Sequence, residues 1–543
     1  MAKFNRPAVR PAASGPVRTE AAPSGRTHEG APGYARDAES ELFLLAVANM
    51  VGEDSFYESA GDRDARFRDL VHQVAVEDPE WAAGFLPWLR GEGNMRSASV
   101  VGAAEFVRAR LGHLDEVLQR DGTAAGYTHA GLPRKVVASV LQRADEPGEL
   151  LAYWTSAYGR AIPKPVKRGV ADAVRRLYNE RGLLKYDAGS RGFRFGDVVD
   201  LVHPSPDPGK PWQGDLFKHA LDRRHGRGED VPERLAMVRA RAELMAVPVA
   251  DRQAVFAADG PERLAAAGMT WEALAGWLQG PMGAKAWEAV IPTMGYMALL
   301  RNLRNFDEAG VRDAVAEQVA AKLADPEQVA RSRQFPFRFF SAHLAAPSLR
   351  WGHALDKALA AATANVPAFP GRTLVLVDTS GSMNGVGVSE RSKMTYAQMA
   401  ALFGVTLASR GDQVDLHGFA SGTFRHEARR GASVLREVER FVNRIGEVGH
   451  GTQIAESVRA TYAGHDRVII LSDMQTFGGG WGGDVTDAAP RGVPMYGFNL
   501  AGYKHGAMPS GSGNRHELGG MTDATFRLIP LLEAGRDAAW PWL

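Results

Sequence analysis

The spacing of hydrophobic residues divides this chain into two long regions. From about residue 36 to residue 364, apolar positions recur every three or four residues, which is the spacing of amphipathic helices. These helices are short, and turns that contain Gly or Pro separate them. The region is therefore predicted to form stacked antiparallel helix pairs, as in a HEAT-like α-solenoid. The predicted helices cover residues 41–50, 81–90, 97–111, 134–142, 166–178, 234–244, 271–278, 294–306, 311–323 and 337–344.

From residue 371 to residue 543, short apolar runs alternate with helical patterns. This alternation is typical of a parallel sheet with helices on both faces, a doubly wound α/β domain. The predicted strands cover residues 374–377, 414–419, 468–471 and 495–500, and the predicted helices cover residues 393–409, 433–445, 453–462 and 525–532.

The remaining segments separate or precede these regions. Residues 365–371 hold two prolines and a glycine, which end the helical pattern just before the first strand. Residues 1–35 are rich in Pro, Ala, Gly, Ser and Arg and show no apolar period, so we predict a disordered tail there.

Oxygen-bearing side chains gather where two of the predicted strands end. Asp378, Ser380 and Ser382 follow the strand at residues 374–377, and Asp473 follows the strand at residues 468–471, which would be the fourth in the doubly wound order. Thr452 lies in a Gly-flanked loop before the helix that leads to the fourth strand. In the strand order 3-2-1-4-5-6 the first and fourth strands are neighbours, so the two carboxylates would face each other across one crevice. Such hard oxygen ligands predict Mg²⁺ that keeps some of its waters or takes a carboxylate from a partner.

Composition narrows the location and the class of partner. The 543 residues include no cysteine, which excludes disulfides and thiolate metal sites. No apolar run is long enough to span a membrane, and we find no secretory signal, so a cytoplasmic protein is expected. The 64 basic and 63 acidic residues give a net charge of +1. Any binding of nucleic acid must therefore use local basic patches.

The order Asp-x-Ser-x-Ser, Thr, Asp resembles the metal-ion-dependent adhesion site of von Willebrand factor A domains. Other segments resemble the TROVE module of telomerase-associated, Ro and vault proteins. Residues 294–305, Met-Gly-Tyr-Met-Ala-Leu-Leu-Arg-Asn-Leu-Arg-Asn, are similar to its MALLRNLRN core. Further similarity lies at residues 41–57, 89–96 and 177–179, and residues 473–479 resemble a segment of the Ro A domain. Over about residues 36–540 the chain resembles the Ro sixty-kilodalton RNA-binding family, and we expect a bacterial relative.

The resemblance implies an architecture and a function. It implies a ring of helical repeats closed by the A domain. Single-stranded ends of misfolded RNA would enter the central hole, and small Y RNAs would bind an outer basic face. It also implies RNA maturation or decay with an exoribonuclease such as polynucleotide phosphorylase. We expect a monomeric protein within the ribonucleoprotein.

Several basic residues are candidates for these RNA contacts. On the predicted helix 294–306, Arg301 and Arg304 point away from the apolar stripe, where they could grip a single strand. Equally, the two arginines could bind carboxylates and carbonyls of adjacent helices and have only a structural role. The further candidates are Lys164, Lys167, Arg168 and Arg175 around one helix, Arg96 in the arginine-bearing loop, and His203, which matches a family histidine.

The outer-face site departs from the family pattern. Phe195 stands where the family has histidine, and Asp200 stands where it has arginine. Arg191 and Arg194 nearby are the candidates to compensate. The departure puts unchanged binding of Y RNA in doubt.

Catalytic motifs are absent from the sequence: we find no P-loop, GxSxG elbow, HExxH or Cys/His pair. The first hypothesis is therefore an RNA-binding protein without chemistry of its own. A second is a Mg²⁺-dependent protein-interaction adaptor that does not bind RNA. A third is a metal-assisted phosphodiesterase, although a second carboxylate cluster and a general base are not evident.

Overall fold

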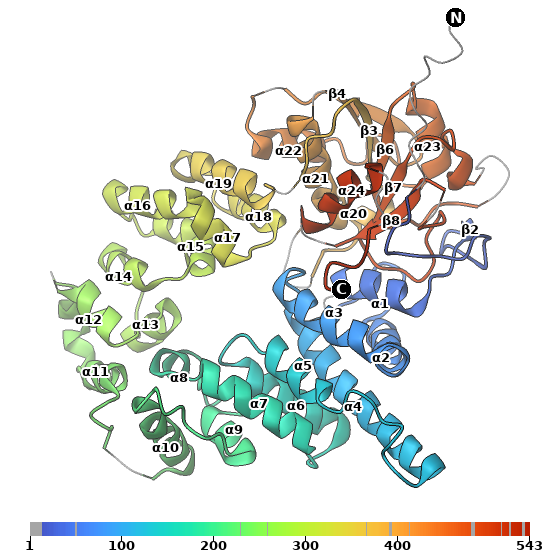
Figure 1. Cartoon of the computed structure of the whole chain (residues 1–543). Helices are drawn as coiled ribbons and strands as arrows, with labels where there is room; N and C mark the ends of the chain where they lie inside the picture. Colours follow the sequence, from blue (N-terminus) through green and yellow to red (C-terminus); the bar gives the residue numbers. More distant parts are fainter. Residues whose placement is uncertain are drawn as a thin grey trace, which may run out of the picture.

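The computed structural model describes residues 13–48, 51–227, 230–257, 259–364, 366–389, 394–411, 413–429, 431–478, 484–511, 513–520, 523–534 and 538–543. A long series of helices begins beside a six-stranded sheet, curves away from it and returns to the sheet domain at its other end (Figure 1). No helix in these ranges is long and apolar enough to cross a membrane.

The curved series confirms the predicted helical solenoid. Its first half comprises α1 (Ala38–Ala48), α2 (Ala60–Glu77), α3 (Pro79–Gly91), α4 (Arg96–Asp121), α5 (Leu132–Val140), α6 (Glu146–Tyr158), α7 (Lys164–Leu177), α8 (Glu180–Tyr186), α9 (Phe195–Val202) and α10 (Trp212–His225). The second half comprises α11 (Ala236–Met245), η1 (Val249–Phe256), α12 (Gly260–Ala266), α13 (Trp271–Leu278), α14 (Ala284–Val290), η2 (Ile291–Thr293), α15 (Tyr296–Glu308), α16 (Asp313–Ala324), α17 (Pro326–Ser332), α18 (Pro336–Ala345) and α19 (Leu349–Ala362).

Helix α15 illustrates why these segments are helical. Its predicted stripe is buried, and the exposed positions between are polar or charged. The Tyr296 hydroxyl donates to the Leu323 carbonyl of α16, 2.7 Å away, so the single polar atom at the start of the stripe is also satisfied. Neighbouring helices pack as pairs in the same way, for example α2 with α4 and α5 with α7. The stripe consists of Tyr296, Leu299, Leu300, Leu303 and Phe306.

The sheet has the predicted doubly wound order. Its strands are β3 (Arg372–Asp378), β4 (Gln413–Phe419), β5 (Thr423–His426), β6 (Arg467–Ser472), β7 (Met495–Asn499) and β8 (Arg515–Gly519), in the spatial order β5-β4-β3-β6-β7-β8. Each neighbouring pair is parallel except β4 and β5, which form an antiparallel hairpin. The edge strands β5 and β8 were not predicted, because both are short and rich in polar residues.

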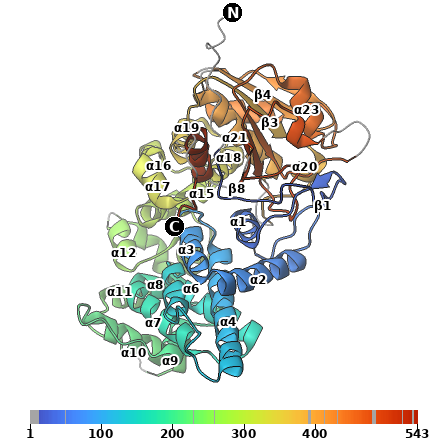
Figure 2. The same ribbon diagram turned by 45° about the vertical axis from the view of Figure 1, so that its right-hand side comes forward.

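Helices cover both faces of the sheet. On β3, Leu374 and Leu376 belong to one core cluster, whereas Val375 and Val377 belong to the other, as the two-residue period of a strand requires. Helix α23 (Ile454–Thr461) packs into the first cluster and α21 (Tyr396–Arg410) into the second, on opposite sides of the strands (Figure 2). The domain is completed by α20 (Gly381–Asn384), α22 (Val434–Val442), η3 (Val485–Asp487), η4 (Asp523–Arg527) and α24 (Leu528–Glu533).

The N-terminal segment packs on the sheet domain, which makes the prediction of a disordered tail wrong for residues 13–35. The short strands β1 (Gly25–Arg26) and β2 (Pro32–Gly33) pair with each other. The Thr27 hydroxyl donates to the Thr476 carbonyl (2.9 Å), and the Tyr34 amide donates to the Gly506 carbonyl (3.1 Å). Polar backbone contacts, which leave no hydrophobic period in the sequence, hold this segment. Residues 1–12 lie outside the described residues.

Both ends of the helical series contact the sheet domain. At its start, α1 packs on β8 so closely that a Cβ atom on Gly519 would lie 2.7 Å from the Leu44 side chain. At its end, α19 packs on α22, and the Asp356 carboxylate accepts a hydrogen bond from the Ser433 hydroxyl (2.9 Å). The solenoid and the α/β domain therefore form a closed ring of contacts.

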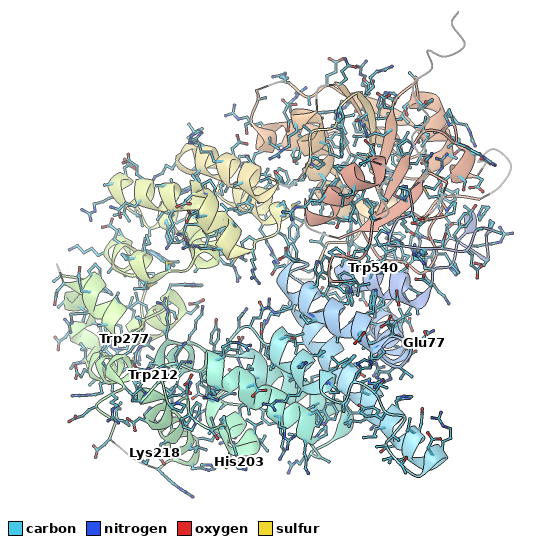
Figure 3. The ribbon with its side chains drawn as sticks, in the orientation of Figure 1. Glu77, His203, Trp212, Lys218, Trp277 and Trp540 are labelled. Atoms are coloured by element: carbon cyan, nitrogen blue, oxygen red, sulfur yellow. The ribbon has the colours of Figure 1, made fainter. Side chains whose placement is uncertain are left out.

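The C-terminal residues add an aromatic contact to this junction. Trp540 and Trp542 stack on each other and meet Phe43 of α1 and Trp81 of α3 at centroid distances between 5.0 and 6.0 Å. Trp540 is labelled beside these helices in Figure 3. Such aromatic packing contributes roughly 1 kcal/mol per pair beyond the burial of apolar area.

A buried ion pair anchors the N-terminal segment. The Arg36 Nε donates to Glu517 Oε2 of β8 over 2.8 Å, and both side chains are fully buried. The Glu517→Gln substitution would leave the Arg36 charge buried with a neutral partner. We expect it to reduce stability by roughly 3 kcal/mol, measured as a lower melting temperature and faster proteolysis near residue 36. In the exposed pair Arg331–Glu327, Glu327→Gln is the control and should cost under about 1 kcal/mol. Equal effects of the two substitutions would contradict this account.

Candidate metal site and basic surfaces

The predicted oxygen ligands come together at the carboxyl ends of β3 and β6. These strands are parallel neighbours, with Val377 opposite Leu471, so Asp378 and Asp473 leave the sheet at the same edge. Ser380 and Ser382 follow on the short turn into α20, and their hydroxyl oxygens lie 3.3 Å apart. The five predicted residues, which include Thr452, are buried.

Local hydrogen bonds fix how these carboxylates point. The Ser380 amide donates to Asp378 Oδ1 (2.9 Å), and the Ser472 hydroxyl donates to Asp378 Oδ2 (2.6 Å). The Gln475 amide donates to Asp473 Oδ1 (3.0 Å). The turn between Asp473 and Gln475 requires a positive φ of 57° at Met474. Each carboxylate is therefore held by the loop that follows its own strand.

One carboxylate oxygen has no partner. Asp473 Oδ2 is buried and forms no hydrogen bond with any described residue. Such an atom is costly, because burial removes its water without replacing it. Burial raises the pKa of Asp378, and burial together with the charge of Asp378 raises the pKa of Asp473. The site thus holds two carboxylates that favour a proton or a cation beside them.

Thr452 belongs to the loop that closes the third side. Its carbonyl accepts hydrogen bonds from the Thr476 hydroxyl (2.9 Å) and the Phe477 amide (3.0 Å), which ties this loop to the one after β6. The preceding His450 carbonyl accepts from the Gly381 amide at the start of α20 (2.8 Å). The three loops therefore support one another.

The donor set fits a hard cation. It offers carboxylate and hydroxyl oxygens, and the described residues contain no group of three or more His, Cys, Asp or Glu arranged around a metal position. Two carboxylates, Asp378 and Asp473, with the hydroxyls of Ser380, Ser382 and Thr452 could hold Mg²⁺ while water or an added ligand filled the remaining positions. A bound cation would supply the interaction that the unpartnered oxygen of Asp473 lacks.

Two residues near this site were missed by sequence reasoning. Tyr57, in the loop between α1 and α2, donates a hydrogen bond from its hydroxyl to the Glu29 carboxylate. The same hydroxyl faces the side chain of Ser382. Because more than 300 residues separate Tyr57 from Ser382, no local pattern could have signalled the contact.

Helix α7 carries the first predicted basic surface. Lys164 and Arg168 are exposed and Lys167 is half-buried near the start of the helix, and none of the three forms an ion pair with a described residue. Arg175, at the other end, lies 3.7 Å from the Asp207 carboxylate. The three free cations adjoin the positive end of a helix dipole, which favours anions there.

Helix α15 carries the second basic surface. Arg301 is exposed and forms no ion pair with a described residue, whereas Arg304 lies 3.5 Å from Glu308 on the exposed face. Arg338 of α18 is close enough to Arg301 that burial and the Arg301 charge lower the pKa of Arg338. Sequence reasoning missed Arg338, because it lies on another helix. Two neighbouring arginines without a described carboxylate partner favour an anionic ligand.

Arg96 does not contribute to an open basic surface. Its guanidinium bonds to Glu146 (3.1 Å), Asp145 (3.1 Å) and Glu149. These bonds connect the start of α4 to the start of α6, so the ion-pair alternative describes Arg96 better than an RNA contact does.

The structure explains one of the two residues, Phe195 and Asp200, that differ from the family pattern on the outer face. Phe195 is buried and stacks on Tyr178, with ring centroids 3.9 Å apart, so it serves the core. Asp200 is exposed on α9, and His203 is exposed at the end of that helix with a φ of 47°. His203 lies far from the sheet domain (Figure 3).

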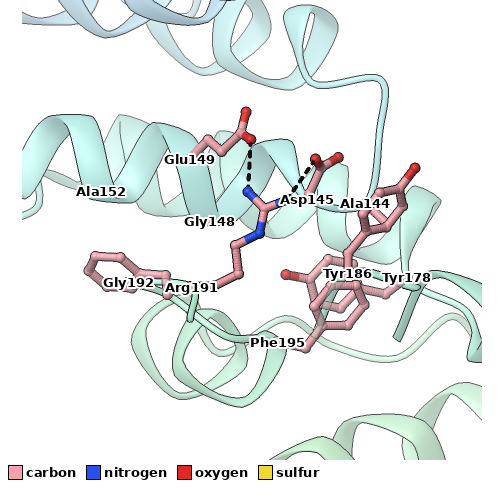
Figure 4. A pocket seen from close by; sticks show the side chains of 11 residues that line it. Ala144, Asp145, Gly148, Glu149, Ala152, Tyr178, Tyr186, Arg191, Gly192 and Phe195 are labelled. Carbon is pink, nitrogen blue, oxygen red and sulfur yellow. Dashed lines mark hydrogen bonds and ion pairs between the residues drawn. The ribbon is translucent and has the colours of Figure 1, made fainter. Parts of the chain in front are cut away.

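A small cavity beside Phe195 has two carboxylates, Asp145 and Glu149, in its lining. It has a volume of about 140 Å³, and Arg191 crosses it to reach Glu149 (3.3 Å) and Asp145 (3.9 Å), as Figure 4 shows. Arg194 is likewise paired, with Asp187 (2.8 Å). Neither arginine is therefore free to replace the positive charge lost at Asp200.

The raised pKa of Asp473 predicts how stability depends on pH without metal. A carboxyl with a raised folded-state pKa contributes stability below its unfolded pKa of about 3.9, and that contribution is lost as the pH rises through the folded value. In EDTA, we expect the melting temperature of the wild type to fall between about pH 5 and about pH 8 by roughly 2–4 °C more than that of Asp473→Asn.

Asp415→Asn is the control for this comparison. Asp415 lies in β4 and accepts hydrogen bonds from Arg372 (3.2 Å) and Arg425 (3.0 Å). Its replacement should lower the melting temperature at both pH values. Parallel pH profiles for the wild type and Asp473→Asn would contradict the prediction.

Comparison with known proteins finds a matching domain and a matching fold. Residues 267–358, which include Arg301, Arg304 and Arg338, match the TROVE domain. Over 95 residues the chain is 34% identical to telomerase protein component 1 of Mus musculus and to that of Rattus norvegicus. The matched stretch is 17% of this chain and only 3% of each of these relatives.

A solved structure extends the likeness to nearly the whole chain. The crystal structure of the Deinococcus radiodurans Ro (RSR) protein matches with a TM-score of 0.60, covering 92% of this chain and all of that one at 20% identity. These matches confirm the resemblance to the TROVE module at residues 267–358 and to the fold of the Ro protein.

Proposed function

We propose that this protein is an RNA-binding component of a ribonucleoprotein, without catalytic chemistry of its own. It binds small noncoding, Y-like RNA and the single-stranded ends of misfolded RNA, in RNA quality control, maturation or decay. The observation that carries the proposal is the TROVE match, because it contains the exposed Arg301 beside Arg338. Guanidinium groups without carboxylate partners are suited to phosphates and to stacking on unpaired bases.

A second RNA surface is proposed at the start of α7. Lys164, Lys167 and Arg168 provide three cations that would contact phosphates of a structured RNA. The neighbouring α9 presents Asp200 where the family has arginine, and Phe195 is part of the core. We therefore place any Y-like RNA over α7 and expect weaker contacts near α9.

Mg²⁺ is proposed at the site formed by Asp378, Ser380, Ser382, Thr452 and Asp473. The unpartnered Asp473 oxygen and the pair of buried carboxylates support this proposal. The bound cation would supply an electrostatic docking point for an acidic group. As further proposals, the protein acts in the cytoplasm as a monomer within the ribonucleoprotein, and an exoribonuclease such as polynucleotide phosphorylase is its partner.

Replacing Arg301 and Arg304 tests the proposed site for single strands. The variant Arg301→Ala/Arg304→Ala should bind a structured RNA with a single-stranded 3′ tail roughly tenfold more weakly, because it loses two phosphate contacts. The slope of log affinity against log salt should become shallower by roughly 1.4. Affinity is measured by fluorescence anisotropy at several salt concentrations, with the same RNA lacking its tail as a second ligand.

The control variant removes two exposed arginines elsewhere. Arg120 and Arg234 each pair with an aspartate, so Arg120→Ala/Arg234→Ala should leave both affinity and slope near those of the wild type. Unchanged tail binding in Arg301→Ala/Arg304→Ala would exclude these residues from the site. Absence of any RNA complex would instead favour a Mg²⁺-dependent protein adaptor, and RNA cleavage abolished by EDTA would favour a phosphodiesterase.

Replacing Asp378 separates metal binding from RNA binding. Mg²⁺ at a hundredfold excess over its Kd should stabilise the wild type by roughly 2.7 kcal/mol and so raise its melting temperature. Asp378→Ala should abolish this rise. RNA tail binding should change by less than about twofold, because the proposed RNA surfaces lie on the helices. Asp415→Ala, in β4 of the same sheet, should keep the Mg²⁺ effect. A Mg²⁺ effect that survives in Asp378→Ala would contradict the assigned site.

A further inference from the structure

The N-terminal segment lies directly over the loop that carries Asp473. Its backbone pairs with this loop, since the Gly478 amide donates to the Glu29 carbonyl (3.1 Å) and Gly30 forms a bridge with Phe477. The His28 amide donates to the Gln475 side chain (2.8 Å), and Gln475 in turn holds Asp473. We refer to residues 25–33, which include β1 and β2, as the strap.

The strap places one carboxylate beside the proposed metal site. The Glu29 side chain accepts a hydrogen bond from the Tyr57 hydroxyl, which also faces Ser382. The Tyr57 ring lies flat against the His28 ring, with centroids 4.8 Å apart, and edge-on against Tyr503 at 5.4 Å. Tyr57 thus connects the strap to the site and is itself held on both sides.

The charge of Glu29 reaches the buried carboxylates. Glu29 is a third carboxylate near Asp378 and Asp473, and it is held there by Tyr57. A third negative charge beside two others repels them unless a cation lies between. The unpartnered Asp473 oxygen, buried and directed into the same site, is the independent sign that a ligand belongs there.

We propose that Glu29 is an internal acidic cap, which would take the place of a partner's carboxylate when the site holds its cation. The inference rests on the metal site of the proposed function, but not on RNA binding. Its consequence is that an acidic group from outside reaches the cation only after the strap is displaced. In the described structure Glu29 reaches the site through Tyr57, so the Tyr57 hydroxyl positions the cap.

Two readouts on the full chain test the cap: the Kd for Mn²⁺ by calorimetry, and the rate of tryptic cleavage after the exposed Arg26 within the strap. In the wild type, saturating Mn²⁺ should slow this cleavage roughly fivefold, because the cation retains Glu29 and therefore the strap. Glu29→Gln should abolish the slowing and weaken Mn²⁺ binding roughly tenfold, which corresponds to about 1.4 kcal/mol.

Two further variants make the outcome specific. Glu20→Gln, an equal charge change at an exposed residue of the same segment, should behave like the wild type. Tyr57→Phe keeps the ring but removes the hydroxyl, and should also abolish the slowing. Retention of the slowing in either Glu29→Gln or Tyr57→Phe, or loss of it in Glu20→Gln, would overturn the proposal.

Acetate provides a direct chemical test. In Glu29→Ala, which leaves space at the cap, acetate at tens of millimolar should restore most of the lost Mn²⁺ affinity, whereas chloride at the same ionic strength should not. The wild type should not respond to acetate. Failure of the rescue would overturn the cap. Absence of Mn²⁺ binding to the wild type would overturn the metal site as well. Neither result would bear on the proposal of RNA binding, which is tested separately.

Discussion

The contact between the N-terminal segment and the carboxyl edge of the sheet is the constraint on which the rest of this molecule depends. It is held by the buried Arg36–Glu517 pair. Nearby, the Arg63 guanidinium of α2 donates to the Ala501 carbonyl (2.9 Å) and so joins the solenoid to the same domain. Burying such charges is expensive, so their geometry must be well satisfied if the contact is to persist. The contact fixes the first helix of the solenoid and also places Glu29 and Tyr57 beside the proposed metal site.

The sheet imposes a second constraint, which is electrostatic. Because β3 and β6 are adjacent and parallel, the chain cannot avoid placing Asp378 and Asp473 at one edge. Hydrogen bonds from Ser380, Ser472 and Gln475 neutralise only part of their oxygens. The negative charge that these hydrogen bonds leave uncompensated is the physical reason to expect a cation. This reason is independent of the resemblance to A domains.

Local patterns in the sequence were sufficient for part of this structure. The apolar runs predicted the four central strands, and the assumed doubly wound order placed Asp378 and Asp473 at one edge of the sheet, where the structure also has them. The helical period likewise gave the stripe on α15. Helices α2, α6, α10 and α19 lie in the region predicted to be helical, although no individual bounds were predicted for them.

What the sequence did not reveal depends on distant pairing. The strap is held by backbone hydrogen bonds and by side chains that are distant in the sequence, so no local pattern distinguishes it from a disordered segment. Arg96, Arg191 and Arg194 are basic in the sequence, yet carboxylates on other elements pair with them. Whether an arginine is free for phosphate depends on these partners, and Arg301 is distinguished by having another arginine, Arg338, as its neighbour.

The closed ring makes the two proposed activities physically dependent on each other. The solenoid meets the sheet domain at α1 and at α19. The strap comes shortly before α1 in the chain, so it adjoins the first of these junctions. Displacing Glu29 removes the hydrogen bond that positions Tyr57, and Tyr57 lies in the loop that joins α1 to α2. An acidic partner that replaced Glu29 would therefore act on the loop next to the ring junction. Binding at the metal site would then bias how firmly the ring is closed, by no more than the difference in its affinity for the two arrangements.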